Sequence, residues 1–309
     1  MTMAGRADPQ ARRSARTAYL LLIVPPLCWA GNFVVGRAIH AEIPPVALTF
    51  WRWVVAAAVL LPLAGAQTWR ARTLIRRQWP LLAMLALSGV VGFQFVVYQG
   101  LHSTTAINGV LIIATIPAVI PAFAYALDGE RITARQGLGI LVSTLGVATI
   151  VLRGDLAAAL ALDVAAGDLW IASAVPMWAL YSVLVRRKPE ALPPLALLLA
   201  IVGIGLAVLA PAYAWELASV GGFTPTLPAF AAMAYVGVAA SVLAFWCWNR
   251  GIAGVGASKA GLYLHLMPVF AALLAVAFLG ERLYGYHGVG MALVAAGLYL
   301  SSTAGGPRR

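Results

Sequence analysis

Polar and aromatic side chains recur at helical spacing inside long apolar segments of this chain. The members of this set are Trp29, Asn32, Gln94, Tyr98, Trp178, Tyr181, Tyr263 and His265. Residues three or four apart share one face of a helix, which groups Trp29 with Asn32, and Gln94 with the tyrosine four residues further on. Indole, phenol and amide groups bind small solutes by stacking and hydrogen bonding. We therefore expect this set to line a central binding cavity.

Each of these groups also has a structural interpretation. Asn32, and the stripe of Gln94 and Tyr98 that continues to His102, could hydrogen-bond neighbouring helices and tighten the packing. Tyr263 and His265 are two residues apart, about 200° round a helix, so only one of them is expected to face the cavity. A lone histidine in an apolar helix is more often a packing residue whose ring nitrogens are hydrogen-bonded. His265 is nevertheless the only mid-span group able to change charge near neutral pH.

The elements that must position these residues are membrane helices. Hydrophobic residues make up 62% of the 309 positions and charged residues only 10%, against roughly 25% charged in soluble domains. A helix needs about 20 apolar residues to cross a bilayer. We predict an all-α membrane protein with ten transmembrane helices, at residues 18–38, 46–66, 79–100, 105–127, 136–153, 167–186, 194–215, 229–249, 258–279 and 287–304.

The basic residues predict the orientation of these spans. With the N-terminus in the cytoplasm, the loops holding Arg76 and Arg187 lie inside, whereas few arginines, such as Arg37, lie outside. Both termini are therefore expected to be cytoplasmic, in the cell (inner) membrane. The net charge of +11 is explained by these loops, so no nucleic-acid partner is predicted. The first span is long enough to be retained rather than cleaved as a signal peptide.

A sequence pattern occurs twice at an offset of 151 positions. Pro117, Gly129-Glu130-Arg131, Gly137, Gly139 and Gly146 return as Pro268, Gly280-Glu281-Arg282, Gly288, Gly290 and Gly297. Two halves of five spans each must enter the membrane from opposite sides, which predicts inverted repeats with alternating access to a midplane site. We expect a tail at 1–17, repeats at 18–153 and 154–304, and a tail at 305–309.

This pattern, with Pro26-x-x-Trp29-Ala30-Gly31-Asn32-Phe33 and Arg52, resembles the EamA family of the drug/metabolite transporter superfamily. The resemblance extends from about Tyr19 to Ser302. It implies an exporter of small metabolites, and the chain looks most like YddG-type exporters of aromatic and other neutral amino acids. The second copy departs from the first, since it keeps Trp178 but has Tyr181 near the Asn32 position.

Several residues are expected to act in gating or structure rather than binding. They are Arg52, Pro117, Pro268, Glu130, Arg131, Glu281 and Arg282. Arg52, between Trp51 and Trp53, either snorkels to the outer interface or lies at the cavity edge and pairs with a substrate carboxylate or helix-end carbonyls. The two prolines are expected to bend their helices as hinges, and the Glu-Arg pairs to lie at the membrane surfaces as caps or gates. The repeated glycines are expected to permit close helix packing.

No Asp or Glu is expected within a span, which favours a facilitator over a proton-coupled pump. Asn249 is expected at the interface. Without a metal-binding or nucleotide-binding motif, no enzyme, metal or cofactor is predicted. The expected partners are a small-molecule substrate, above all amino acids, and membrane lipid, and a homodimer is left open. The alternatives are a proton-coupled exporter of drugs or nucleobases, an intramembrane enzyme, or a non-transporting scaffold.

Overall fold

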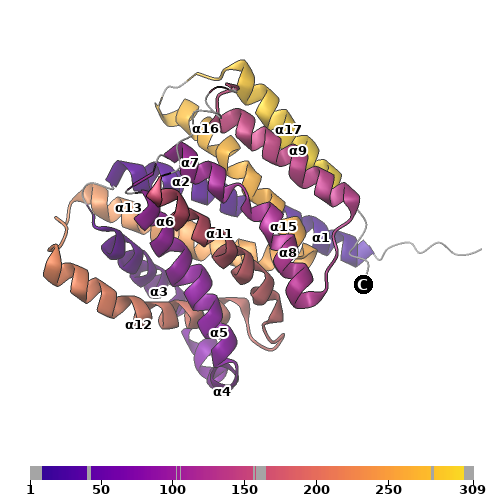
Figure 1. The fold of residues 1–309 in the computed structure, drawn as a ribbon. Coiled ribbons are helices and arrows are strands. Elements are labelled where there is room, and N and C mark those ends of the chain that lie inside the picture. The colour runs from indigo at the N-terminus through magenta and orange to yellow at the C-terminus, as the bar shows by residue number, and fades with distance from the viewer. Residues whose placement is uncertain are drawn as a thin grey trace, which may run out of the picture.

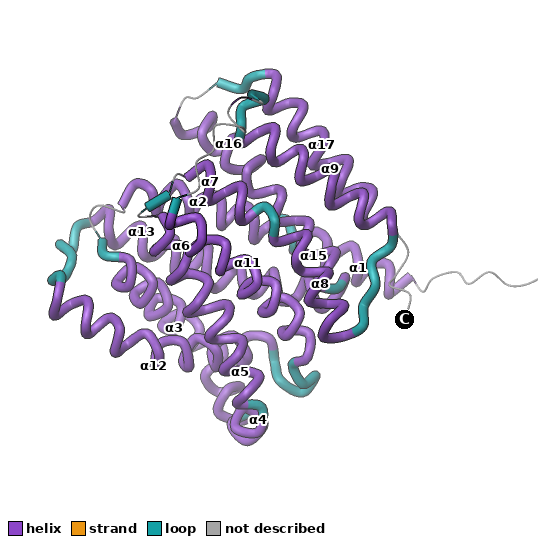
Figure 2. The backbone as a smooth tube through the Cα atoms, viewed as in Figure 1, coloured by secondary structure: helices purple, strands orange, loops and turns teal. Residues whose placement is uncertain are grey.

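The computed structural model describes residues 9–39, 43–101, 103–104, 106–155, 157, 165–279 and 282–302. These residues form helices and short connections, with no strand among them (Figure 1). Loops, drawn in teal in Figure 2, are confined to the ends of the helices. Two residues with a predicted role lie outside the described residues. They are His102, at the end of the stripe of Gln94 and Tyr98, and Glu281, of the second Glu-Arg pair.

The first half is a series of continuous and broken helices. Its elements are α1 (Pro9–Leu21), α2 (Val24–Ile39), α3 (Pro45–Arg70), α4 (Arg72–Arg77), α5 (Trp79–Leu85), the π-helix η1 (Ala86–Gly92), α6 (Phe93–Leu101), α7 (Ala106–Ile113), α8 (Ile116–Asp128) and α9 (Ala134–Val151).

The second half follows the same order of long, broken and glycine-rich helices. Its elements are α11 (Ala166–Leu184), the 3-10 turn η2 (Val185–Arg187), α12 (Pro194–Ser219), α13 (Leu227–Gly237), the π-helix η3 (Val238–Leu243), α14 (Ala244–Val255), α15 (Ala257–Gly261), the 3-10 turn η4 (Leu262–His265), α16 (Leu266–Leu279) and α17 (Gly285–Ser302).

Eight helical segments of the described chain are long and apolar enough to cross a membrane. They are Pro45–Arg70, Trp79–Gly100, Gly109–Asp128, Ala134–Val151, Ala166–Arg187, Pro194–Ser219, Leu227–Val255 and Ala257–Phe278. The predicted first and last spans, which correspond to α1 with α2 and to α17, are not among the eight. The total of ten spans and the position of the termini therefore stay predictions.

Local sequence signals explain where these helices begin and end. Pro45 and Pro194 occupy the first turn of α3 and α12, where a missing N–H costs no helical hydrogen bond. A capping box begins α9, since Thr133 Oγ accepts from the Gln136 N–H at 3.2 Å and the Gln136 side chain accepts from the Thr133 N–H at 2.8 Å. Gly129 ends α8 with φ of 66°, so the glycine of the repeated Gly-Glu-Arg block is a helix C-cap.

Irregular backbone occurs at equivalent places in the two halves. The π-helices η1 and η3 begin at Ala86 and Val238, within one position of the 151-residue offset. Pro117 follows the break between α7 and α8, and Pro268 follows the 3-10 turn η4. Both prolines therefore lie in the first turn of a helix that follows irregular backbone, and the predicted bends and hinge function stay predictions.

The repeated glycines bring α9 and α17 together as a close pair, which Figure 1 shows side by side. A Cβ atom added to Gly139 would lie 2.7 Å from the Gly297 carbonyl oxygen, and one added to Gly146 would lie 2.7 Å from that of Gly290. Each contact crosses between the repeats, since Gly139 meets the copy of Gly146, and Gly146 meets the copy of Gly139. A two-fold relation between the halves produces this arrangement.

The expectation that the spans hold no acidic residue is wrong at three positions, Asp128, Asp168 and Glu216. Asp128 is the last residue of α8 and pairs with Arg187. Asp168 lies in the first turn of α11, is buried, and accepts from the Thr104 hydroxyl and from the Ala165 N–H. Glu216 lies near the end of α12, because this helix runs four residues beyond the predicted span, and it is also buried. Its two carboxylate oxygens accept from the N–H groups that begin α3. The carboxylates of Asp168 and Glu216 therefore satisfy helix N-termini.

Candidate functional site

Five aromatic side chains from three helices pack together between the two halves. This central aromatic cluster consists of Trp29 on α2, Trp178 and Tyr181 on α11, and Phe245 and Trp248 on α14. Its ring centroids lie 5.0 to 6.2 Å from their neighbours, the range in which aromatic rings attract one another. No member is more than 8% exposed. In this conformation the cluster is closed to solvent.

The cluster contains a contact between equivalent residues of the two halves. Trp29 and Trp178 occupy equivalent sequence positions, and their rings meet edge to face at 5.0 Å. His265 Nε2 likewise lies 2.9 Å from the carbonyl oxygen of Ala114, the residue 151 positions earlier. A residue contacts its own copy only close to a two-fold axis, so both contacts agree with the predicted relation between the repeats.

Two tryptophans hydrogen-bond to carbonyl groups of the π-helices. Trp29 Nε1 donates to the Ala240 carbonyl oxygen in η3 at 3.0 Å, and Trp53 Nε1 donates to the Val90 carbonyl oxygen in η1 at 3.0 Å. A π-helical turn leaves carbonyl groups without the usual i+4 donor, so they can accept from side chains. Trp53 is completely buried, which disfavours the interpretation that Arg52 snorkels to the outer interface between two exposed tryptophans.

Tyr181 packs directly on the backbone of η1 and bonds to α14. A Cβ atom at Gly89 would lie 2.4 Å from the Tyr181 ring, so glycine makes room for the ring. The Tyr181 hydroxyl donates to Asn249 Oδ1 at 3.0 Å. Asn249 is only 8% exposed, which corrects its expected interfacial position.

Several buried polar atoms around the cluster have no hydrogen-bond partner among the described residues. They are Trp178 Nε1, Trp248 Nε1, Asn249 Nδ2 and Asn32 Oδ1. Three are donors and one is an acceptor. Such groups are costly to bury unless a ligand or water satisfies them, so they are suited to bind a solute that carries both acceptors and donors.

Arg52 adjoins the cluster and does not snorkel to the outer interface as one interpretation expected. Its side chain has no exposed surface. Nε donates to Ser241 Oγ at 3.0 Å, and Nη2 donates to the Ala240 carbonyl oxygen at 3.5 Å, the same oxygen that Trp29 uses. The guanidinium carbon lies 5.2 Å from the centre of the Trp53 ring. Arg52 lies inside the bundle because these partners surround its guanidinium there.

The predicted stripe on α6 lies beside this arginine. Arg52 Nη1 donates to the Tyr98 hydroxyl at 3.4 Å, and Gln94, one turn earlier, is buried. These two residues are placed near the cluster without a ring contact to it among the described residues. Their role in binding a solute stays a prediction.

Tyr263 and His265 face different neighbours. Tyr263 stacks on Tyr19 of α1 at 6.1 Å between ring centroids. His265 is fully buried, with Nδ1 at 2.7 Å from Ser143 Oγ and Nε2 bonded as described above. Both histidine nitrogens therefore have partners in the packing between the repeats, which agrees with its structural interpretation.

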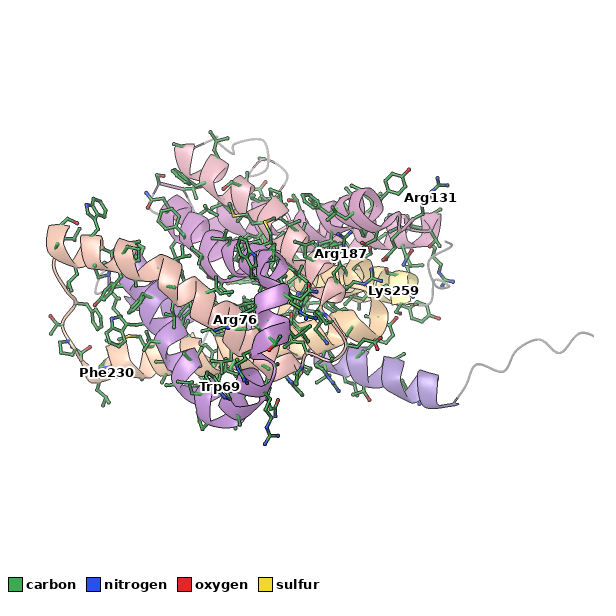
Figure 3. All side chains as sticks on the ribbon, turned by 90° about the horizontal axis from the view of Figure 1, so that it is seen from below. Trp69, Arg76, Arg131, Arg187, Phe230 and Lys259 are labelled. Atoms are coloured by element: carbon green, nitrogen blue, oxygen red, sulfur yellow. The ribbon has the colours of Figure 1, made fainter. Side chains whose placement is uncertain are left out.

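Ion pairs join the ends of three helices at one end of the bundle. Glu130 pairs with Arg186 of η2 and accepts from Ser258 Oγ at 3.3 Å, rather than pairing with the adjacent Arg131. Arg187 pairs with Asp128 at 2.7 Å. Figure 3 shows Arg131, Arg187 and Lys259 toward the right of the view, whereas Phe230 lies at the left edge.

Arg131 and Arg282 are both exposed, and the Arg131 guanidinium carbon lies 5.8 Å from the centre of the Tyr125 ring. No group of three His, Cys, Asp or Glu side chains in the described part of the chain could hold a metal ion.

The sequence interpretation missed Phe245 and Trp248 of the cluster. Together with Ser241 and Asn249 they recur at positions three or four apart on η3 and α14. This spacing marks one helix face, and it is the signal that could have identified them.

The comparisons with known proteins agree with one another. The model of the EamA-like transporter family matches residues 16–152 and 165–303, one match for each half. The chain is 27% identical to the uncharacterized transporter YyaM of Bacillus subtilis over 92% of this chain and 93% of the relative. It is 24% identical to the aromatic amino acid exporter YddG of Ancylobacter novellus, over 85% of this chain and 89% of that protein.

A solved crystal structure has the same fold. The superposition has a TM-score of 0.77 at 21% identity, and it covers 93% of this chain and 97% of the other. The two-repeat helical arrangement is therefore shared by a protein of distant sequence.

Proposed function

The chain belongs to the EamA-like transporter family and is a multi-pass membrane transporter, and we propose that it exports neutral amino acids with aromatic or aliphatic side chains. The proposed mechanism is alternating access, in which the inverted halves open the central aromatic cluster to one side of the membrane and then to the other. The end of the bundle that carries Arg187 and Lys259 faces the cytoplasm in this proposal, as the basic loops predict.

The contact between Trp29 and Trp178 is the observation that carries this proposal. The two indoles occupy equivalent positions in the two halves, and their ring centroids lie 5.0 Å apart, which supports a position for the cluster on the axis about which the halves would rock. A site on that axis is exposed to opposite sides by equivalent motions of the two repeats.

The chemistry around the cluster favours a zwitterion with an apolar body. Aromatic rings provide a surface for an aromatic or aliphatic side chain. The unpaired donors of Trp178, Trp248 and Asn249 suit a carboxylate, and the unpaired Asn32 Oδ1 suits an ammonium group. A relative whose name describes aromatic amino acid export supports this choice of solute.

The buried carboxylates favour a facilitator over a proton-coupled pump. Asp168 and Glu216 both accept from backbone N–H groups at helix N-termini, where negative charge is stabilised. The solute gradient would then drive net flux.

Uptake of labelled amino acids into proteoliposomes tests the function. We expect saturable flux of phenylalanine, tryptophan and leucine that an imposed pH gradient does not change. Trp178→Phe keeps a ring but removes the unpaired N–H, and a hydrogen bond to a charged group is worth about 1.5–3 kcal/mol, so affinity should fall about tenfold or more.

Trp215→Phe is the matched control, because Trp215 on α12 is 73% exposed. Equal effects of the two substitutions would contradict the placement of the site. Flux that requires a pH gradient would favour the proton-coupled alternative, and no flux of any amino acid would refute the proposed solute class.

A further inference from the structure

Arg52 is a buried cation that no carboxylate neutralises within the described part of the chain. Its side chain has no exposed surface, and no described Asp or Glu lies within 4.0 Å of it. Burying an unpaired charge costs several kcal/mol, so such a residue is retained where its charge has a use.

The partners that Arg52 does have are neutral and only partly satisfy it. Ser241 Oγ accepts at 3.0 Å, but the Tyr98 hydroxyl and the Ala240 carbonyl oxygen lie at 3.4 and 3.5 Å, beyond the usual range for such bonds. A guanidinium also has more N–H donors than these three partners accept. The group is therefore held in place with capacity for a further acceptor.

Arg52 also has a direct connection to the central aromatic cluster. It shares the Ala240 carbonyl oxygen with Trp29, and the Trp53 ring over which it lies contacts Phe245 at 5.2 Å between centroids. A solute lying against the cluster would thus have the guanidinium at one side. The acceptor Asn32 Oδ1, one turn from Trp29, would remain for an ammonium group.

We propose that Arg52 recognises the carboxylate of the transported solute and thereby makes the protein select amino acids over the corresponding amines. A carboxylate accepts two parallel N–H bonds from a guanidinium, which neither hydroxyl nor carbonyl partner can do. An amine without a carboxylate would leave the buried charge unneutralised and would add a second positive charge beside it. This inference rests on the proposed function, since it specifies the substrate class of the same site.

A purely structural role for Arg52, in which it ties α3 to η3, makes a different prediction. Loss of such a tie would lower stability and flux for every solute alike. Only carboxylate recognition changes the ratio between an acid and its amine, so this ratio is the informative measurement.

The experiment compares phenylalanine, phenylalaninamide and phenethylamine as solutes in proteoliposomes. We expect the wild-type protein to transport phenylalanine at least a hundredfold faster than phenethylamine. Arg52→Gln should reduce phenylalanine flux at least tenfold and bring the acid-to-amine ratio close to one. Arg52→Lys keeps the positive charge but cannot donate two parallel N–H bonds. Its acid-to-amine ratio should lie between those of the wild type and Arg52→Gln.

Arg72→Gln is the matched control, because Arg72 also stacks on a tryptophan, Trp69, at 4.9 Å but is exposed. It should transport as the wild type does. An Arg52→Gln protein that folds and keeps the wild-type acid-to-amine ratio would overturn the inference.

Ligand-induced thermal stabilisation of the wild-type protein keeps the inference testable if Arg52→Gln does not fold. We expect 3-phenylpropionate, which has a carboxylate but no ammonium group, to raise the midpoint temperature of unfolding. Phenethylamine should leave that temperature unchanged. The opposite order would overturn the carboxylate assignment. If the wild type transports phenylalanine and phenethylamine equally, this inference fails while the proposed function stands, and if it transports neither, the proposed function fails.

Discussion

Substitution of Gly146 by alanine tests the close pairing of α9 and α17. The added Cβ would lie 2.7 Å from the Gly290 carbonyl oxygen, 2.8 Å from the Val294 nitrogen and 2.9 Å from Leu293 Cβ. Two of these atoms are backbone, so α17 must move away from α9. Overpacking of this kind costs about 1–3 kcal/mol, whereas replacing glycine by alanine in a helix returns up to about 1 kcal/mol.

A control on the same helix separates the two effects. Gly137 also lies in α9, but the nearest atom to its added Cβ is 3.9 Å away, so Gly137→Ala gains helix propensity without a clash. We expect Gly146→Ala to be less stable than Gly137→Ala by about 1–3 kcal/mol. Tryptophan fluorescence during denaturant unfolding in mixed micelles measures this difference. Equal stability of the two variants would refute the close approach of the helices.

Three further substitutions give distinct expectations. Glu216→Gln removes a charge from the N-terminus of α3 and should lower the free energy of unfolding by about 1 kcal/mol, measured in the same way; an unchanged value would contradict the cap. His265→Leu breaks the bond to Ser143 and should cost about 1–3 kcal/mol without changing the pH profile of flux, so an altered profile would contradict its packing role. Glu130→Gln breaks the ion pair with Arg186 and should change the free energy of unfolding by less than about 1 kcal/mol. If this ion pair acts as a gate, the substitution should speed the labelling of buried Cys247 by a water-soluble maleimide, and unchanged labelling would contradict that role.

The repeat in the sequence predicted two related halves and close helix packing at the repeated glycines, but it did not predict that α9 pairs with α17. A fixed offset of 151 positions implies equivalent folds, and equivalent residues near a two-fold axis contact each other. The crossed glycine contacts of α9 with α17 agree with that relation, and so does the ring contact of Trp29 with Trp178, whose offset is 149. The family was also predicted from these motifs and is confirmed.

Other features depend on contacts that the sequence does not reveal. Glu216 is buried because the N-terminus of α3, about 170 residues away, lies against it. Trp53 and Asn249 have the residue types of a membrane interface, and the sequence does not reveal their hydrogen bonds to Val90 and Tyr181 inside the bundle. The π-helices consist of apolar residues that α-helices also use, so composition does not distinguish them.

Counterflow most directly tests the claim that this protein carries amino acids by alternating access. Proteoliposomes are loaded with unlabelled phenylalanine, and the initial uptake of labelled phenylalanine is compared with that of empty vesicles. A carrier returns faster when it is loaded, so we predict that internal phenylalanine accelerates labelled uptake and that Trp178→Phe reduces this acceleration. Uptake that internal phenylalanine does not affect, and that rises linearly with concentration, would contradict alternating access at the central aromatic cluster.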